Sequence, residues 1–209
     1  IEPRIAEKVF VIDTPSSDAA AMQQLARAAD AIVVWGGDDA VRAVRSMAQP
    51  DTRIIEWGHK ISFAYVSGEE FREDELRGLA KHICETNQLL CSSCQGIYLD
   101  TDSFERVTAF AERFFAILEN MAEHDSLPED PFRAAQTTIA SYTEELETLR
   151  ANKRIFRGKP CGVVAYDDTG LTPSCAFRNV WVRPLPRREL LTTLKQYKNH
   201  LQTAALICD

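Results

Sequence analysis

Short β-rich runs alternate with helical patterns along the first hundred residues of this chain. The runs expected as strands are 8–13, 31–37, 53–58 and 60–68, and the segments expected as helices are 14–30, 38–48 and 71–88. Neighbouring parallel strands need a long connection, so strands that alternate with helices favour a parallel sheet with right-handed crossovers. We therefore expect an α/β protein with a mostly parallel sheet flanked by helices.

The second half of the chain first becomes helical and then returns to strands. Residues 103 to about 152 show a helical pattern that a break at LPEDP (127–131) divides into two helices. Further strands are expected at 161–168, 179–186 and 201–208, with a helix at 190–200. With 209 residues, 45% of them hydrophobic, the chain is long enough to bury a full core.

The charge of the chain argues against a nucleic-acid-binding surface. The formal net charge is −7, and lysine and arginine form no stripe along any segment. The only basic cluster is RPLPRR (183–188), which we interpret as a solvated turn after a strand in preference to an anion site.

Neither a membrane span nor a signal peptide is evident in the sequence. No apolar run reaches the length of a transmembrane helix, and the first residues, IEPRIAEK, lack the basic start and apolar centre of a signal peptide. We expect a cytoplasmic protein whose six cysteines stay reduced, since the chain is too long and core-rich for a small disulfide scaffold. Both ends look cut, which leads us to expect a fragment of a longer chain.

Two segments carry residues that could bind a ligand at the end of a strand. In VVWGGDDAV (33–41), glycines lie between a strand and a helix start, but the GxGxxG spacing is absent and the two aspartates would repel a phosphate. A plain tight turn is an equal alternative. In RIIEWGHK (53–60), Glu56 lies near the end of an apolar strand, where open α/β sheets place their sites. Burial could raise its pKa toward that of a general base, and a solvated or Lys60-paired glutamate is the alternative.

NQLLCSSCQG (87–96) places two cysteines three residues apart. A structural zinc site needs four ligands, and the chain has no second CxxC and only four scattered histidines, so we expect no metal. A thioredoxin-like motif normally follows the first strand of its fold, whereas this one follows several. A cysteine in a polar loop beside small serines can present its sulfur and a nearby amide to a carbonyl group. We therefore favour Cys91 as a single nucleophile and Cys94 as a packed thiol. Burial is the alternative for the remaining cysteines, Cys84, Cys161, Cys175 and Cys208.

Several motifs follow one another in a recognisable order: VVWGG, IIEWGHK, NQLLCSSCQGIY, RNVWVRPLP and LQTAAL. The first three resemble the aldehyde dehydrogenase superfamily, in which a strand-glycine turn contacts the cofactor, an ELGGK-like motif supplies a glutamate and a GQxC-like motif supplies the nucleophilic cysteine. Within that superfamily the chain looks most like the LuxC-type acyl-CoA reductases, which share a WGG turn, a cysteine segment close to QQxCFSTQxIY, a VxPxP strand and an LQTVG-like segment.

The resemblance implies roles for five residues. Cys91 matches the nucleophilic cysteine of the family, and Glu56 matches the general base of the dehydrogenases. The turn of Trp35, Gly36 and Gly37 would lie near the nicotinamide half of the cofactor, which the family implies to be NADPH.

The resemblance also implies a domain division and partners. Residues 1–58 would be the C-terminal part of the dinucleotide-binding domain, and 59–209 the catalytic domain. His59 replaces the second glycine of ELGGK, so the backbone turn there is expected to differ. Family members imply a homo-oligomer and, in luminous bacteria, a complex with acyl-protein synthetase and transferase subunits.

The function implied is NADPH-dependent reduction of a fatty acyl-CoA or acyl-protein thioester to the fatty aldehyde, through an acyl group bound to cysteine. One alternative is an aldehyde dehydrogenase that oxidises an aldehyde, with Glu56 activating water. The others are a non-catalytic domain that retains the fold and a thiol redox protein with a reversible Cys91–Cys94 disulfide. The phenylalanines of the helical segment could line an acyl channel or be ordinary core; they are Phe104, Phe110, Phe114 and Phe115.

Overall fold

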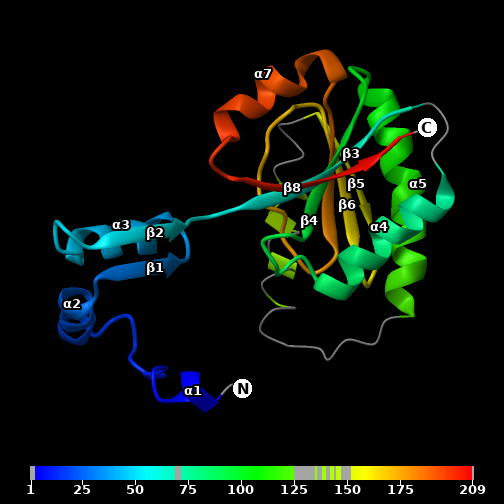
Figure 1. Ribbon diagram of the computed structural model, residues 1–209. Helices are drawn as coiled ribbons and strands as arrows, with labels where there is room; N and C mark the ends of the chain where they lie inside the picture. Colours follow the sequence, from blue (N-terminus) through cyan, green and yellow to red (C-terminus); the bar gives the residue numbers. More distant parts are fainter. Residues whose placement is uncertain are drawn as a thin grey trace. The chain divides into compact units, whose positions relative to one another are not determined.

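The computed structural model describes residues 3–68, 72–124 and 152–208, with residues 135, 138, 139, 142, 143, 145 and 146 between the last two ranges (Figure 1). The chain divides into two compact units, Ile1–His59 and Lys60–Asp209. The sequence placed a domain boundary one residue earlier, between 58 and 59. The identity of the first unit as the end of a cofactor domain stays a prediction.

The first unit is built around two parallel strands. Its elements are α1 (Pro3–Ala6), α2 (Ala19–Ala28), β1 (Ala31–Trp35), α3 (Asp38–Met47) and β2 (Arg53–Trp57). β1 pairs with β2 in parallel, from Ala31 opposite Arg53 to Trp35 opposite Trp57. α2 begins after Asp18, whose carboxylate accepts a 3.0 Å hydrogen bond from the Ala21 amide and so caps the helix.

One strand expected in the first unit is absent. Residues 8–13 are not part of a strand, and the apolar side chains from Val9 to Ile12 are exposed. A β-rich run forms a strand only where another strand accepts its hydrogen bonds, and among the described residues no strand pairs with this run. The prediction for 8–13 is therefore wrong.

The second unit contains a six-stranded sheet in the order β5-β6-β7-β4-β3-β8. The strands are β3 (Ile61–Val66), β4 (Cys94–Leu99), β5 (Lys153–Arg157), β6 (Gly162–Tyr166), β7 (Asn179–Pro184) and β8 (Leu201–Ile207). All neighbours are parallel except β5 and β6. The prediction of a mostly parallel sheet is thus confirmed.

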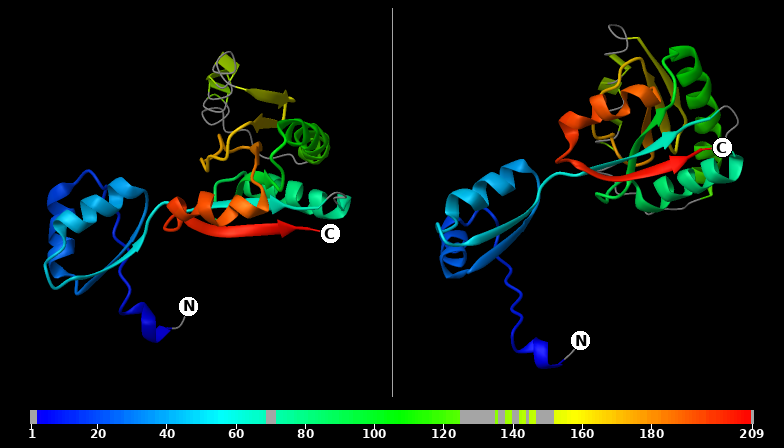
Figure 2. Two further views of the ribbon diagram at one scale, coloured as in Figure 1. Left: turned by 90° about the horizontal axis from the view of Figure 1, so that it is seen from above. Right: turned by 45° about the horizontal axis from the view of Figure 1, so that its top comes forward.

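Helices cover both faces of this sheet. α4 (Glu73–Thr86) and α5 (Phe104–Glu123) lie on one face, and α7 (Leu190–Leu194) lies on the other between the 3-10 turns η1 (Arg187–Glu189) and η2 (Lys195–Tyr197), as Figures 1 and 2 show. The segment 190–200, expected as one helix, is therefore a short α-helix followed by a 3-10 turn. The larger hydrophobic core lies between the sheet and α4 and α5, and a smaller one lies under α7.

The phenylalanines of α5 belong to the larger core. Phe110 and Phe114 are buried and stack with ring centroids 6.1 Å apart, and Phe104 and Phe115 pack against the same cluster. This result supports the interpretation of these phenylalanines as core residues, and not the alternative that they line an acyl channel. The expected break at 127–131 lies outside the described residues. Among the helices that the structure describes, none is both long and apolar enough to cross a membrane.

Candidate active site around Cys91

Cys91 lies in an exposed turn that joins α4 to β4. α4 ends at Asn87, which is in the left-handed conformation with φ 47°. The turn is closed on itself, because the Leu90 amide donates to Ser93 Oγ at 3.1 Å and the Ser93 amide donates to the Leu90 carbonyl at 2.9 Å. Ser93 is fully buried. The turn therefore has a fixed base and presents Cys91 to solvent.

A serine on β3 ties the backbone of Cys91 to the sheet. Ser62 Oγ donates to the Cys91 carbonyl at 2.8 Å and accepts a hydrogen bond from the Thr203 amide at 3.1 Å. Ser62 is itself buried. One hydroxyl thus connects the cysteine turn with β3 and β8, which limits the movement of the Cys91 backbone.

Two glutamines hold the same turn from the other side. Gln95 Nε2 donates to the Gln88 carbonyl at 3.0 Å, and Gln95 Oε1 accepts from Ser174 Oγ at 2.9 Å. Gln88 Nε2 in turn donates to the Cys94 carbonyl at 3.0 Å. The sequence interpretation missed these positioning residues, although a glutamine inside an otherwise apolar strand, CQGIYL, was a signal for a buried polar network.

The loop before β7 is strained where it meets this turn. Ala176, Phe177 and Arg178 have positive φ values of 56°, 49° and 67°, which cost about 1 kcal/mol or more each in residues other than glycine. The Phe177 amide donates to the Asn87 carbonyl at 3.0 Å. Such strain persists only where surrounding contacts impose it, and it is frequent at functional sites.

The second cysteine of the motif is part of the core. Cys94 is 4% exposed, and its Sγ donates to the Gly96 carbonyl at 3.2 Å. Burial raises the pKa of this thiol to about 12. Cys94 therefore packs, as the sequence predicted, and Cys91 is the open thiol of the pair. Cys84 and Cys161 are also buried, whereas Cys175 is half-buried and Cys208 exposed.

Glu56 forms an ion pair within the first unit. Its carboxylate is held by the guanidinium of Arg45 on α3, with Arg45 Nη2 2.6 Å from Glu56 Oε2. The hydrogen bond from Arg45 lowers the pKa of Glu56 below its ordinary value. The expectation that burial would raise this pKa is therefore wrong, because the side chain is accessible and paired. The alternative partner, Lys60, donates to the Asn199 carbonyl at 2.6 Å.

Substitution of Arg45 by alanine is expected to raise the pKa of Glu56 toward its ordinary value of 4.5, because the positive partner is removed. Because the pKa of Glu56 is lower in the folded state than in the unfolded state, the ion pair stabilises the unit at pH values above the unfolded-state pKa. This stabilisation is lost as the pH falls through the folded-state pKa. NMR titration of the Glu56 carboxyl carbon measures the shift. Arg42→Ala, which removes the partner of Asp39 on the same helix, is the control. An unchanged titration of Glu56 in Arg45→Ala would contradict the assignment.

The WGG turn is open to its surroundings in the first unit. Trp35 is 77% exposed, and its ring lies 5.7 Å from that of Trp57. A Cβ atom at Gly36 would lie 2.9 Å from the Ala40 Cβ, whereas one at Gly37 would meet no atom within 4 Å. The backbone at Gly37 is thus approachable beside an aromatic surface. Its role in cofactor binding stays a prediction, as does the general-base role of Glu56.

Two arginines of the basic cluster 183–188 form ion pairs with carboxylates. Arg183 is buried, is paired with Asp168 and lies 4.2 Å from the Tyr166 ring centroid. Arg188 Nη2 lies 3.0 Å from Asp102 Oδ2 at the surface. The interpretation as a solvated turn is therefore wrong for Arg183 and describes only the exposed end of the cluster.

Comparisons with known proteins identify relatives of the chain. Residues 1–209 match the protein family described as Acyl-CoA reductase (LuxC). The long-chain acyl-protein thioester reductase 2 of Photobacterium leiognathi is 33% identical over 145 residues, which cover 69% of this chain and 29% of the relative. The long-chain acyl-protein thioester reductase of Vibrio harveyi is 30% identical over 48% of this chain and 21% of its own length. The matched segments thus span less than a third of these relatives.

Solved structures of the aldehyde dehydrogenase superfamily share the fold. A proline utilization A (PutA) structure with proline bound in remote sites has a TM-score of 0.66 at 12% identity, over 97% of this chain and 24% of that one. PnpE in complex with nicotinamide adenine dinucleotide has a TM-score of 0.63 at 16% identity, over 86% of this chain and 41% of that one. These matches confirm the expected fold.

Proposed function

Because the chain belongs to the LuxC family of acyl-CoA reductases, we propose that it contributes Cys91 as the nucleophile to the reduction of a long-chain fatty acyl thioester to the fatty aldehyde. The observation that carries this proposal is that the two cysteines of the CSSC motif differ in exposure. Cys91 is exposed on a turn whose backbone is held by hydrogen bonds, whereas Cys94 is buried. The names of the relatives support an acyl-protein donor, and an acyl-CoA would offer the same thioester.

The thiolate of Cys91 would attack the carbonyl carbon of the donor thioester. A carbon–sulfur bond to Cys91 forms, the bond to the donor sulfur breaks, and the donor leaves as a thiolate that takes a proton from water. Exchange between two thioesters has little energetic cost, because the bond that forms and the bond that breaks are of the same kind. The hydrogen bond from Ser62 to the Cys91 carbonyl holds the backbone during the exchange.

Reduction requires a hydride, which NADPH would supply when bound. Among the described residues of the first unit, the exposed ring of Trp35 and the open backbone at Gly37 fit a flat aromatic ring of that cofactor. When the acyl carbon is reduced, the bond to sulfur breaks and Cys91 takes back its electron pair as a thiolate. The lowered pKa of Glu56 makes this carboxylate a weaker base, which disfavours the rival reaction in which Glu56 activates water.

Intact mass spectrometry after incubation with tetradecanoyl-CoA tests the nucleophile. We expect one tetradecanoyl adduct on the chain, the same adduct on Cys94→Ala, and none on Cys91→Ala, because Cys91 is the exposed thiol of the proposed site and Cys94 is buried. Cys208→Ala removes another exposed cysteine and is the matched control. An adduct that persists on Cys91→Ala, or its absence from the unsubstituted chain, would contradict the proposal.

A further inference from the structure

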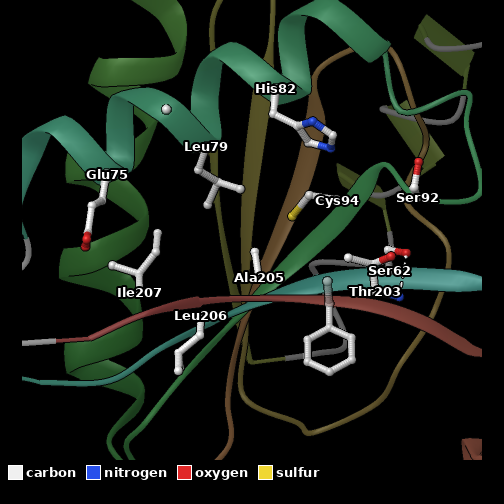
Figure 3. Close-up of a pocket in the computed structure, with 12 residues that line it drawn as sticks. Ser62, Glu75, Leu79, His82, Ser92, Cys94, Thr203, Ala205, Leu206 and Ile207 are labelled. Carbon is white, nitrogen blue, oxygen red and sulfur yellow. Dashed lines mark hydrogen bonds between the residues drawn. The ribbon is translucent and has the colours of Figure 1, made fainter.

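The second unit contains a cavity of about 370 Å³ between α4, β3 and β8. Figure 3 shows Ser62, Ser92 and Thr203 gathered at one end and Ile207 with Glu75 at the other. A pocket of this size lies within the range of roughly 300–1,000 Å³ that is usual for small-molecule sites. The cavity is therefore large enough to bind a ligand.

The hydroxyl-rich end of the cavity adjoins the Cys91 turn. Ser92, which lines the cavity, is the next residue after Cys91. Ser62 lines it as well and donates its hydroxyl hydrogen to the Cys91 carbonyl at 2.8 Å. The cavity and the proposed nucleophile are thus connected through two neighbouring residues. Cys91 itself is not among the lining residues, and the cavity begins one residue beyond it.

The middle of the cavity is largely apolar, and His82 projects from α4 between Leu79 and the end at Ser92 (Figure 3). Leu79 projects from α4, Cys94 lines the centre, and Ala205 faces them from β8, as Figure 3 shows. The high pKa of Cys94, about 12, keeps its thiol neutral, so it behaves as a small apolar side chain. Gly78 widens the cavity on the helix side, because a Cβ atom there would meet no atom within 4 Å.

A carboxylate marks the far end. Glu75 Oε1 lies 3.9 Å from Arg72 Nη1, and Glu75 Oε2 is shielded from solvent without a hydrogen bond from any described residue. The cavity thus runs from hydroxyl groups at the Cys91 turn, through a largely apolar middle, to a charged end. This order suits a molecule whose polar head is at Cys91 and whose tail is apolar and of limited length.

We propose that this cavity receives the hydrocarbon chain of the acyl group that Cys91 carries. The inference rests on the proposed function and adds to it the place of the acyl chain. Each methylene group removed from water would strengthen binding, so the apolar walls would favour long acyl donors over short ones. The walls come from α4 and β8, and not from the phenylalanines of α5.

Two adjacent residues of β8 provide a matched pair of variants. Ala205 lines the cavity, whereas Ala204, which precedes it on the strand, is not among the lining residues. Both are exposed, so a tryptophan at either position leaves the core intact. Gly78→Leu narrows the cavity from the opposite wall and improves the helix propensity of α4. It therefore tests the cavity with little risk to folding.

Binding of the fluorescent fatty acid cis-parinaric acid to these variants tests the inference without any acyl transfer. We expect saturable binding to the unsubstituted chain and to Ala204→Trp, and binding weaker by about tenfold or more, or about 1.4 kcal/mol, in Ala205→Trp and Gly78→Leu. Lack of binding to the unsubstituted chain, or equal binding to Ala205→Trp and Ala204→Trp, would overturn the inference.

Acylation rates of Cys91 with tetradecanoyl-CoA and acetyl-CoA separate this inference from the proposed function. We expect Ala205→Trp to slow the long donor by about tenfold while the short donor reacts at an unchanged rate. Equal slowing of both donors would overturn the cavity assignment while the role of Cys91 stands. Parinaric acid binding that follows the cavity variants, with no acylation by either donor, would instead support the cavity and contradict the proposed function.

Discussion

Replacement of Gly96 by alanine is expected to destabilise the second unit by about 3 kcal/mol or more, beyond the usual cost of overpacking. Gly96 lies on β4 directly opposite Trp181 on β7. A Cβ atom at this position would lie 1.9 Å from Trp181 Cδ2 and 2.0 Å from Cε2, well inside van der Waals contact. One of the two must therefore move before the strands can pair.

The indole of Trp181 has little freedom to give way. It is 3% exposed, its Nε1 donates to the Thr172 carbonyl at 2.8 Å, and its ring packs edge-on against Tyr98 at 5.0 Å. Urea unfolding monitored by circular dichroism measures the loss of stability. A Gly96→Ala/Trp181→Leu double variant should be less destabilised than the sum of its single changes, because leucine leaves room for the added methyl group.

Gly78 offers a control with the same chemical change. It is exposed on α4, where an added Cβ atom would meet no atom within 4 Å. Gly78→Ala is expected to stabilise the unit by about 0.5–1 kcal/mol, because alanine costs less backbone entropy in a helix. A Gly96→Ala variant that unfolds at the same urea concentration as the unsubstituted chain would show that β4 and β7 do not pair as closely as described.

The alternation of apolar runs was sufficient to predict most strands, and its failures have physical causes. β4 was not expected, because its sequence CQGIYL interrupts an apolar run with Gln95, which is half-buried in a hydrogen-bond network, and with a glycine next to Trp181. β5 was not expected because its sequence, KRIFR, carries charges typical of an edge strand. Residues 8–13 have strand composition, but no strand in the described part of the chain pairs with them. Local patterns cannot supply such long-range partners.

The candidate site could be located from the sequence, but the hydrogen bonds that hold the Cys91 turn in place could not be predicted. The CSSC motif and its neighbours predicted which thiol is open and which is packed. The Ser62 hydrogen bond spans 29 residues and the Gln95–Ser174 bond spans 79, so neither follows from a local pattern. The pKa of Glu56 was misjudged because its partner, Arg45, lies on a neighbouring helix eleven residues away.

Alkylation of the folded chain by iodoacetamide at pH 8 is expected to modify Cys91 and to spare Cys94. The reactive species is the thiolate, and a thiol with a pKa of about 12 is ionised to only about one part in ten thousand at this pH. Cys94 is also 4% exposed, so the reagent cannot reach its sulfur without local unfolding. The two rates are therefore expected to differ by about a thousandfold or more. Peptide mapping by mass spectrometry over time measures both rates in one sample.

The other cysteines provide internal controls for this experiment. Cys208 is exposed and should react at a rate near that of Cys91, whereas Cys161, whose pKa burial also raises to about 12, should be spared like Cys94. In 8 M urea all of these thiols should react alike, because unfolding removes the burial that separates them. Equal labelling of Cys91 and Cys94 in the folded chain would contradict the site and favour the redox alternative, since a reversible disulfide needs both sulfurs to be accessible. Protection of Cys94 alone would leave Cys91 as the thiol of this motif that is free to attack a thioester.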